Sequence, residues 1–146
     1  MRPANVSGMT ARRSSVIGLL LVLGLGATGC GRSDDRERAT AVAERFFTAI
    51  GSGDGATACE QLSVDTRQTL EQGEQKPCRE AIGELEIEPG APARVDVFLT
   101  GAEAELDNGD RAFLSETQEG WRLSAVGCKP GAEPPAEEPM DCALEA

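Results

Sequence analysis

Apolar residues recur with a helical period between residues 39 and 50. Asp34 or Asp35 can cap the start of this segment, and a turn at Gly51–Gly53 ends it. The apolar positions follow the spacing i, i+3, i+4, i+7, i+8 and i+11: Ala39, Val42, Ala43, Phe46, Phe47 and Ile50. Because this spacing gathers them on one face, the pattern predicts a helix that packs one side against a core.

Three shorter helices are predicted between residues 54 and 85. Asp54 can cap the first and Ser63 the second, over residues 64–71. Pro77 fits the first turn of the third, where a missing N–H costs no hydrogen bond. The apolar residues expected to face inward are Ala56, Cys59 and Leu62 in the first helix, Val64 and Leu70 in the second, and Cys78, Ala81, Ile82 and Leu85 in the third.

The hydrophobic period changes to two after residue 92, which predicts β-strands. Asn108-Gly109 marks a hairpin turn, because glycine accepts a positive φ there. Helices followed by hairpin-connected strands predict an α+β fold, with the helices on one face of a four-stranded antiparallel sheet. The expected strands cover residues 93–100, 102–106, 111–117 and 121–126.

The first 29 residues have a different pattern. Arg2, Arg12 and Arg13 precede an apolar run over residues 16–27, and no acidic residue occurs among these 29. The run of 12 residues is shorter than the roughly 20 that a membrane-spanning helix needs. Basic residues, a short apolar run and small residues before a cleavage site compose a secretory signal, so residues 1–29 are predicted to be a signal peptide. Arg12-Arg13 leaves both the general secretory and the twin-arginine export routes open.

Ala27-Thr28-Gly29-Cys30 resembles the lipobox of bacterial lipoproteins, in which the cysteine thiol receives a diacylglyceryl group and a peptidase cuts before it. Leucine is usual three places before that cysteine, and here Ala27 stands there. The alternative is a secreted protein in which Cys30 has no role, but removing Cys30 leaves an even four of the five cysteines. The resemblance implies lipidation of Cys30 on the outer face of the cell membrane, with residues 30–38 as a charged tether.

The other four cysteines are expected to form two disulfides in an oxidising compartment. Three pairings are possible, and we favour Cys59–Cys78 with Cys128–Cys142. The first pair would join two neighbouring short helices, and the second would fasten the Pro- and Glu-rich tail, residues 129–146, to the last strand. A zinc site and a redox-active pair are the alternatives, but both need closely spaced cysteines, which the sequence lacks.

Charge and residue types narrow the possible functions. All 25 acidic residues but only 11 of the 14 basic ones follow residue 29, so the mature chain has a net charge of −14, which argues against nucleic-acid binding. Histidine, the commonest general base, does not occur in the sequence. Asp96 and Glu116 are carboxylates on predicted strands, and Asp96 is expected to face solvent. Glu84, Glu86 and Glu88 lack the spacing of a calcium loop, so no catalytic, cofactor-binding or metal-binding residue is assigned.

Three segments, residues 42–50, 53–59 and 120–128, resemble small lipoproteins of high-GC Gram-positive bacteria that are similar to the nuclear transport factor 2 (cystatin-like) superfamily. Their sequences are Val-Ala-Glu-Arg-Phe-Phe-Thr-Ala-Ile, Gly-Asp-Gly-Ala-Thr-Ala-Cys and Gly-Trp-Arg-Leu-Ser-Ala-Val-Gly-Cys. The resemblance covers residues 39–142 and implies, for residues 39–128, a cone of helices on a curved sheet that encloses a pocket.

Some members of that superfamily are isomerases or dehydratases, and many are binding or accessory domains. The catalytic members use an Asp or Glu base with Tyr, His or another acid opposite, and this chain has neither Tyr nor His. We therefore expect a lipid-anchored binding or interaction domain for an envelope protein. The alternative is a pocket domain for a small apolar ligand, or an enzyme that uses a lone carboxylate. Phe47 and Phe98 fall at the margin or outside of their apolar faces, and could line a pocket or a partner surface.

Overall fold

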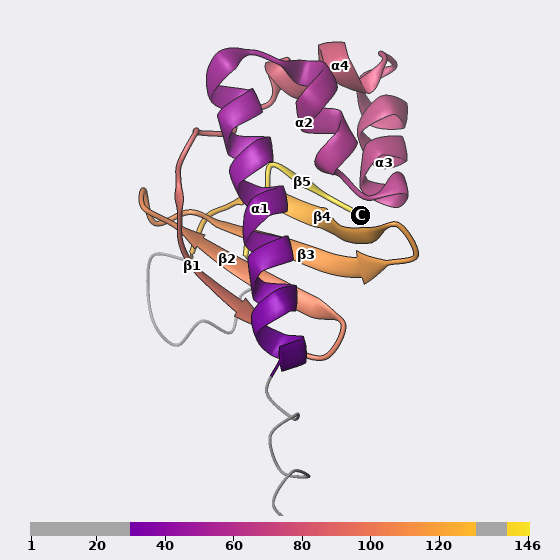
Figure 1. Cartoon of the computed structure of the whole chain (residues 1–146). Helices are drawn as coiled ribbons and strands as arrows, with labels where there is room; N and C mark the ends of the chain where they lie inside the picture. The colour runs from indigo at the N-terminus through magenta and orange to yellow at the C-terminus, as the bar shows by residue number, and fades with distance from the viewer. Residues whose placement is uncertain (1–29, 131–139) are drawn as a thin grey trace, which may run out of the picture. The chain divides into compact units, whose positions relative to one another are not determined.

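The computed structural model describes residues 30–130 and 140–146 (Figure 1). The chain divides into two units, Met1–Cys30 and Gly31–Ala146, and the second contains the folded elements below. The predicted signal peptide and the lipobox residues before Cys30 lie outside the described residues, as does part of the tail, residues 131–139. Among the described residues, no helix is long and apolar enough to cross a membrane.

The described part contains four α-helices, which come before the sheet in the sequence. They are α1 (Cys30–Ser52), α2 (Gly55–Gln61), α3 (Val64–Glu74) and α4 (Cys78–Ala81), which continues into a 3-10 turn, η1 (Ile82–Glu84). Figure 1 shows α1 crossing in front of the sheet, with α2, α3 and α4 grouped above β4 and β5 in that view. This order of elements confirms the predicted α+β class.

Helix α1 begins earlier than the sequence predicted. Residues 30–38 are helical, so Asp34 and Asp35 lie inside the helix and do not cap it. Two interactions hold this first part of the helix. Asp35 pairs with Arg38 at 3.8 Å across one turn, and the Arg36 Nε donates to the carbonyl oxygen of Val95 at 3.0 Å. The charged composition suggested a tether, but charged side chains at this spacing also support a helix.

The predicted apolar face of α1 packs against the sheet. Ala39, Val42, Ala43 and Phe46 are buried, and Ile50 is partly buried against the same core. Phe47 is also buried, only 2% exposed, although the periodicity placed it at the margin of the face. Its ring meets that of Phe46 edge to face at 5.0 Å, so the two aromatic rings widen the buried face of the helix.

Local capping fixes the starts of α2 and α3 as predicted. The Asp54 carboxylate accepts hydrogen bonds from the Thr57 N–H at 3.1 Å and the Thr57 hydroxyl at 2.6 Å. The Ser63 hydroxyl accepts from the N–H of Thr66 at 3.1 Å. Pro77 directly precedes α4. These caps satisfy helix N–H groups that have no partner within the helix.

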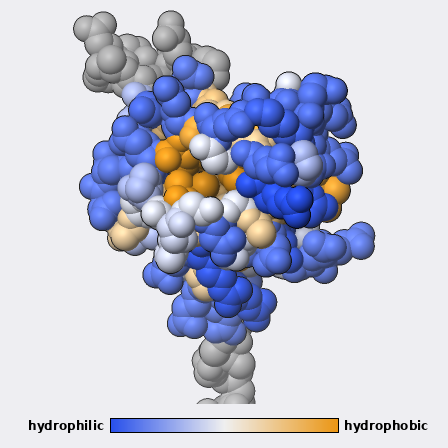
Figure 2. Space-filling model, turned by 90° about the horizontal axis from the view of Figure 1, so that it is seen from above, coloured by the Kyte–Doolittle hydropathy of each residue, from blue (hydrophilic) through white to orange (hydrophobic). Residues whose placement is uncertain are grey.

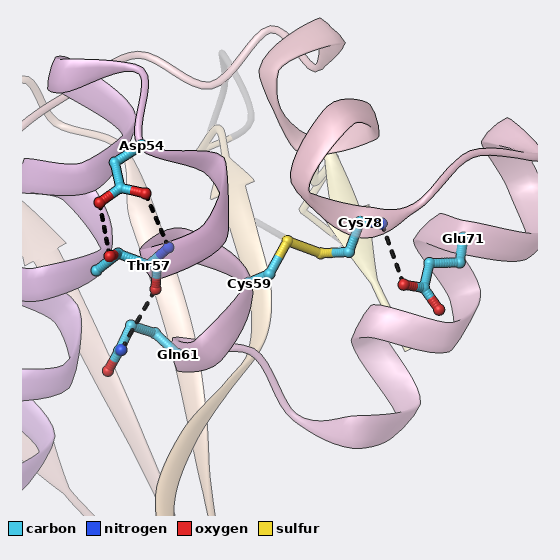
Figure 3. Close-up of a disulfide and its surroundings, with 6 residues drawn as sticks. All are labelled: Asp54, Thr57, Cys59, Gln61, Glu71 and Cys78. Atoms are coloured by element: carbon cyan, nitrogen blue, oxygen red, sulfur yellow. Dashed lines mark hydrogen bonds between the residues drawn. A yellow bond between two sulfur atoms is a disulfide. The ribbon is translucent and has the colours of Figure 1, made fainter.

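Both predicted disulfides are present. Cys59–Cys78 joins α2 to α4, with a Cα–Cα distance of 6.1 Å, and Figure 3 shows it bridging the two helices. The N–H of Cys78 donates to the Glu71 carboxylate at 3.1 Å, so α3 also holds the start of α4. Cys128–Cys142 fastens the C-terminal segment to the end of β4. The disulfides therefore tie α2 to α4 and the C-terminal segment to β4 covalently, whereas α3 is held to the start of α4 by the Glu71 hydrogen bond.

The sheet has five antiparallel strands, each beside its neighbour in sequence, where the sequence predicted four. They are β1 (Pro92–Val97), β2 (Gly101–Leu106), β3 (Arg111–Thr117), β4 (Gly120–Cys128) and β5 (Leu144–Glu145). The fifth strand was missed because the tail composition predicts little burial, yet Leu144 is buried beside β4. Gly127, at φ 65°, lets Ala143 approach β4 closely, since a Cβ on residue 127 would lie 2.8 Å from the Ala143 Cβ.

The first strand is shorter than the sequence predicted. Alternation extended it to Thr100 with Leu99 facing inward, but β1 ends at Val97 and Leu99 is 89% exposed. The chain reverses between Phe98 and Gly101, and the Phe98 N–H donates to the Gly101 carbonyl oxygen at 2.8 Å. Because the turn begins at Phe98, Leu99 lies beyond the sheet and has no core to enter.

Candidate functional site

The inner face of the sheet is filled by apolar side chains. The buried cluster contains Phe46, Ile82, Leu106, Leu114 and Leu123 among its largest members. The hollows found at the described surface are open grooves. One of about 440 Å³ is lined by residues 84–86 and by both sides of the Cys128–Cys142 link. Another of about 370 Å³ runs along α1 and the start of α2.

The two carboxylates considered as catalytic candidates are not brought together. Asp96, on β1, lies 2.6 Å from the guanidinium of Arg94 and is paired with Glu103 across the β1–β2 register. Glu116, on β3, is exposed and lies opposite Trp121 of β4. Neither residue lines the grooves described above. Asp96 and Glu116 therefore share neither of these grooves, and the strand register places Glu103, not Glu116, opposite Asp96.

The glutamates between residues 84 and 88 do not form a metal site. Glu84 pairs with Lys76 at 2.6 Å, and this hydrogen bond raises the pKa of the Lys76 ammonium above its usual value. Glu86 and Glu88 are exposed. Within residues 30–130 and 140–146, no group of three or more cysteine or acidic side chains is placed to hold a metal ion.

The face of the sheet opposite the core carries alternating polar residues, and we call it the outer sheet face. Successive side chains of a strand point to opposite sides, so these residues alternate with the buried Val95, Ala104, Ala112, Leu114 and Leu123. The outer sheet face consists of Arg94, Asp96, Glu103, Glu105, Arg111, Phe113, Ser115, Arg122 and Ser124.

Strand register brings one aromatic residue to the middle of the outer sheet face. Phe113 of β3 lies opposite Glu103 of β2 on one side and Ala125 of β4 on the other, and it is half-buried. The Phe113 carbonyl oxygen accepts a hydrogen bond from the Ser124 hydroxyl at 3.2 Å, which joins β3 to β4 at this point. The pairing of β3 with β4 shifts register on both sides of Phe113, and this hydrogen bond joins the two strands at that irregularity.

Ion pairs surround this aromatic residue. The guanidinium of Arg111 lies 2.7 Å from the Glu103 carboxylate, and both side chains are half-buried. The arginine on β1 pairs with Asp96, and Arg122 reaches Glu119 at 3.9 Å. The outer sheet face holds three arginines and three carboxylates, so it is neutral in a mature chain of net charge −14. Arg94 and Glu119 are the most exposed members of these pairs, and exposed ion pairs add little stability, so these two side chains are accessible to a partner.

Alternation already implied that Phe113 and Arg111 face away from the core, because it placed Ala112 and Leu114 inward. It did not reveal which residues of the neighbouring strands lie beside them. That information requires the strand register, which the turns and bulges of the folded chain determine. Sequence reasoning therefore overlooked Arg111, Phe113 and Arg122 as residues of one surface.

A second surface feature lies at the end of the domain where α1 finishes. Figure 2 shows apolar atoms, in orange, gathered in a hollow and surrounded by hydrophilic atoms, in blue. Two partly buried apolar residues, Ile50 near the end of α1 and Leu85 after η1, belong to elements that end on this side. A hollow with apolar atoms at its surface suits an apolar group better than a charged one.

Comparison of the chain with protein-family models, with curated proteins and with solved structures gives no match. The resemblance to lipoproteins of the nuclear transport factor 2 type therefore depends on the sequence motifs and remains a prediction. What the chain does must be argued from its own surfaces.

Proposed function

We propose that this chain is a lipid-anchored extracytoplasmic domain that binds another protein of the cell envelope through the outer sheet face. The observation that carries the proposal is the half-buried Phe113 surrounded by paired charges on an otherwise acidic domain. Protein interfaces are enriched in aromatic and arginine residues at the points that contribute most to affinity, with polar groups at the rim. The outer sheet face has this composition.

Cysteine usage supports the lipid anchor. Four of the five cysteines are paired in disulfides, and the fifth is Cys30. The unit that contains the sheet starts at Gly31, directly after it. A lipid on Cys30 would thus be attached at the start of the folded domain, and two acyl chains suffice for stable anchoring. The disulfides suit an oxidising compartment outside the cytoplasm.

Helices followed by an antiparallel meander also support the inferred relation to the nuclear transport factor 2 superfamily. In this proposal the domain serves as one of its binding members, not as one of its enzymes. Asp96 is engaged by Arg94, and Glu116 stands exposed at the end of its strand. Neither carboxylate is buried among apolar side chains.

Photocrosslinking in the native membrane tests the protein partner. Phe113 is replaced by p-benzoylphenylalanine, which preserves an aromatic ring, and the exposed Thr69 of α3 is replaced in a control variant. Irradiation should give a discrete crosslinked product with the residue 113 probe and none with the residue 69 probe. Equal labelling at both positions, or no product from residue 113, would contradict a specific interface on the outer sheet face.

The anchor has a separate test. Cys30→Ala should move the protein from the membrane fraction to the medium or leave its signal peptide uncut. Mass spectrometry of the purified wild type should show the acyl mass on Cys30. A variant that is processed and fractionated like the wild type would refute lipidation.

The apolar hollow in Figure 2 favours a second candidate function, the binding of a small apolar molecule. Native mass spectrometry of protein purified from its own membrane distinguishes the two. A retained small molecule would favour the pocket. Acylated protein without such a molecule favours the interaction domain.

A further inference from the structure

Two large apolar side chains project from the turn between β1 and β2. Phe98 is 60% exposed and Leu99 is 89% exposed. Turns usually contain Gly, Asn, Asp or Pro, whereas Phe98 and Leu99 are large and apolar and leave much of their surface in contact with solvent. We call residues 98–100 the apolar turn.

The apolar turn is held in place by the sheet. The Phe98 N–H donates to the Gly101 carbonyl oxygen at 2.8 Å, and the Glu116 N–H of β3 donates to the Thr100 carbonyl oxygen at 2.9 Å. Backbone hydrogen bonds thus fix the turn on both sides. The two apolar side chains are presented from a defined position.

The turn lies beside the first turns of α1, at the bottom of Figure 1. The Arg36 Nε donates to the Val95 carbonyl oxygen at 3.0 Å, which joins the helix to β1 at this end. From that bond Gly31 is about 8 Å back along the helix, and Phe98 is about 10 Å further along the strand. Cys30 is covalently joined to Gly31, so any lipid on it is attached at the end of the domain that carries the apolar turn.

Charge is balanced at this end of the domain. Residues 31–38 contain three arginines and three carboxylates, whereas residues 39–146 account for the whole mature net charge of −14. A neutral segment can approach an anionic membrane surface, which would repel the acidic remainder. The apolar turn therefore lies beside the segment of the mature chain that an anionic membrane surface does not repel.

We propose that Phe98 and Leu99 form a second membrane contact, entering the boundary between lipid headgroups and acyl chains beside the anchor on Cys30. This inference rests on the proposed lipidation. Two side chains bury too little area for a protein interface, which needs about 1,000 Å² or more. A bilayer accepts single apolar side chains, and the lipid on Cys30 supplies a high local concentration of membrane. Together the lipid and the turn hold the domain at two points and limit its rotation on the membrane.

Tryptophan fluorescence in brominated bilayers tests the contact. The acylated full-length product of the cell is reconstituted into vesicles of equal parts phosphatidylcholine and phosphatidylglycerol, with and without bromine on the acyl chains. Leu99→Trp places a probe in the apolar turn. The wild type, whose one tryptophan is the buried Trp121, gives the baseline. Val64→Trp is the matched control, because Val64 is an exposed apolar residue at the start of α3.

Leu99→Trp should lose roughly half of its added emission in brominated vesicles, since insertion of about 5–10 Å brings the ring to the bromines. Wild type and Val64→Trp should stay unchanged. Acylated Leu99→Trp without quenching overturns the membrane contact and leaves the anchor intact. Purified protein without an acyl mass on Cys30 overturns the anchor and this proposal together. Self-association of the wild type that Phe98→Ser/Leu99→Ser abolishes, with no quenching, would assign the turn to a second copy of the chain and also overturn the proposal.

Discussion

Replacing Cys128 and Cys142 together by alanine should release β5 from the sheet. Besides this disulfide, β5 pairs with β4 at two register positions, Ala125–Glu145 and Val126–Leu144. The N–H groups of Lys129, Ala143 and Ala146 form backbone hydrogen bonds across the junction at 2.9, 3.2 and 3.3 Å. One apolar side chain, that of Leu144, is buried there. The disulfide is the covalent link that keeps these groups together.

The expected magnitude follows from two terms. Burial of Leu144 contributes about 2 kcal/mol, but ordering residues 140–146 costs roughly 1 kcal/mol or more for each residue. Without the covalent link the segment should therefore detach. In addition, opening a closed loop of 14 residues lowers the free energy of global unfolding by about 3 kcal/mol. This loss is a large share of the about 5–15 kcal/mol that stabilises a typical domain.

Two measurements distinguish detachment of β5 from the loss of global stability. Hydrogen exchange at the amides of Ala143 and Ala146 reports detachment of β5, and we expect both to lose protection. Urea unfolding followed by Trp121 fluorescence reports global stability, since this residue is 3% exposed in the fold. With a slope of about 1.5 kcal/mol per molar urea, the midpoint should fall by about 2 M.

The other disulfide provides the control. Replacing Cys59 and Cys78 by alanine opens a loop of 19 residues and should lower global stability by a similar amount, about 3 kcal/mol. It should leave the amides of Ala143 and Ala146 protected. If these amides stay protected after loss of the C-terminal disulfide instead, packing of Leu144 holds β5, and the reasoning above is wrong.

Three further predictions concern single side chains. Gly55→Ala would drive a Cβ into a backbone carbonyl of α4 and should lower the free energy of unfolding by about 1–3 kcal/mol in the urea titration. Gly73→Ala is the control, because a Cβ there meets no atom within 4 Å. It should raise the free energy of unfolding by about 0.5–1 kcal/mol. Thr66→Val removes a buried hydroxyl that donates to a β4 carbonyl at 3.1 Å, and should cost about 1–3 kcal/mol. Hydrogen bonds from Thr57 lower the pKa of Asp54, so its contribution is present above the unfolded pKa of 3.8 and is lost as the pH falls through the folded value. Asp54→Asn should therefore flatten the stability–pH curve below pH 3.8, and an unchanged curve would contradict the capping role.

Local patterns predicted most of the helical part of the fold, but Ala56 and Val64, which were expected to face inward, are exposed because each lies in the first turn of its short helix. The apolar face of α1 and the caps at Asp54 and Ser63 follow from spacing within one or two helical turns, and the structure confirms them. The disulfide between α2 and α4 was predicted for the same reason, since it joins inward positions of neighbouring helices. The periodicity and capping signals lie within a few residues of the helices they determine.

Features that depend on distant parts of the chain were not predicted. Leu99 continues the alternation of β1, but the turn that excludes it from the sheet is set by pairing with β2 and β3. Leu144 belongs to a tail of disordered composition, and only the link through Cys142 brings it to β4. In both places the position of the leucine is determined by a contact between distant segments and not by the local pattern.

The outer sheet face also combines a local feature that the sequence predicts with a strand alignment that it does not. Alternation indicates that Phe113 points away from the core, which is a local property. That Glu103 and Arg111 form a pair beside it depends on how β2 and β3 align, and the sequence does not contain that alignment in readable form. The sequence therefore pointed to Phe98 as a candidate for a partner surface, but the residues that lie together on the outer sheet face became clear only from the folded structure.

The two disulfides also determine the order in which the chain can oxidise. Each links cysteines that are consecutive in the sequence, Cys59 with Cys78 and Cys128 with Cys142, and the two loops do not overlap. On a chain that leaves an export channel from its N-terminus, Cys78 emerges as the next cysteine after Cys59, well before Cys128. If the thiol of Cys30 is acylated as proposed, the native bonds are the ones that form first, and a product oxidised in this order requires no thiol–disulfide exchange to reach its final state.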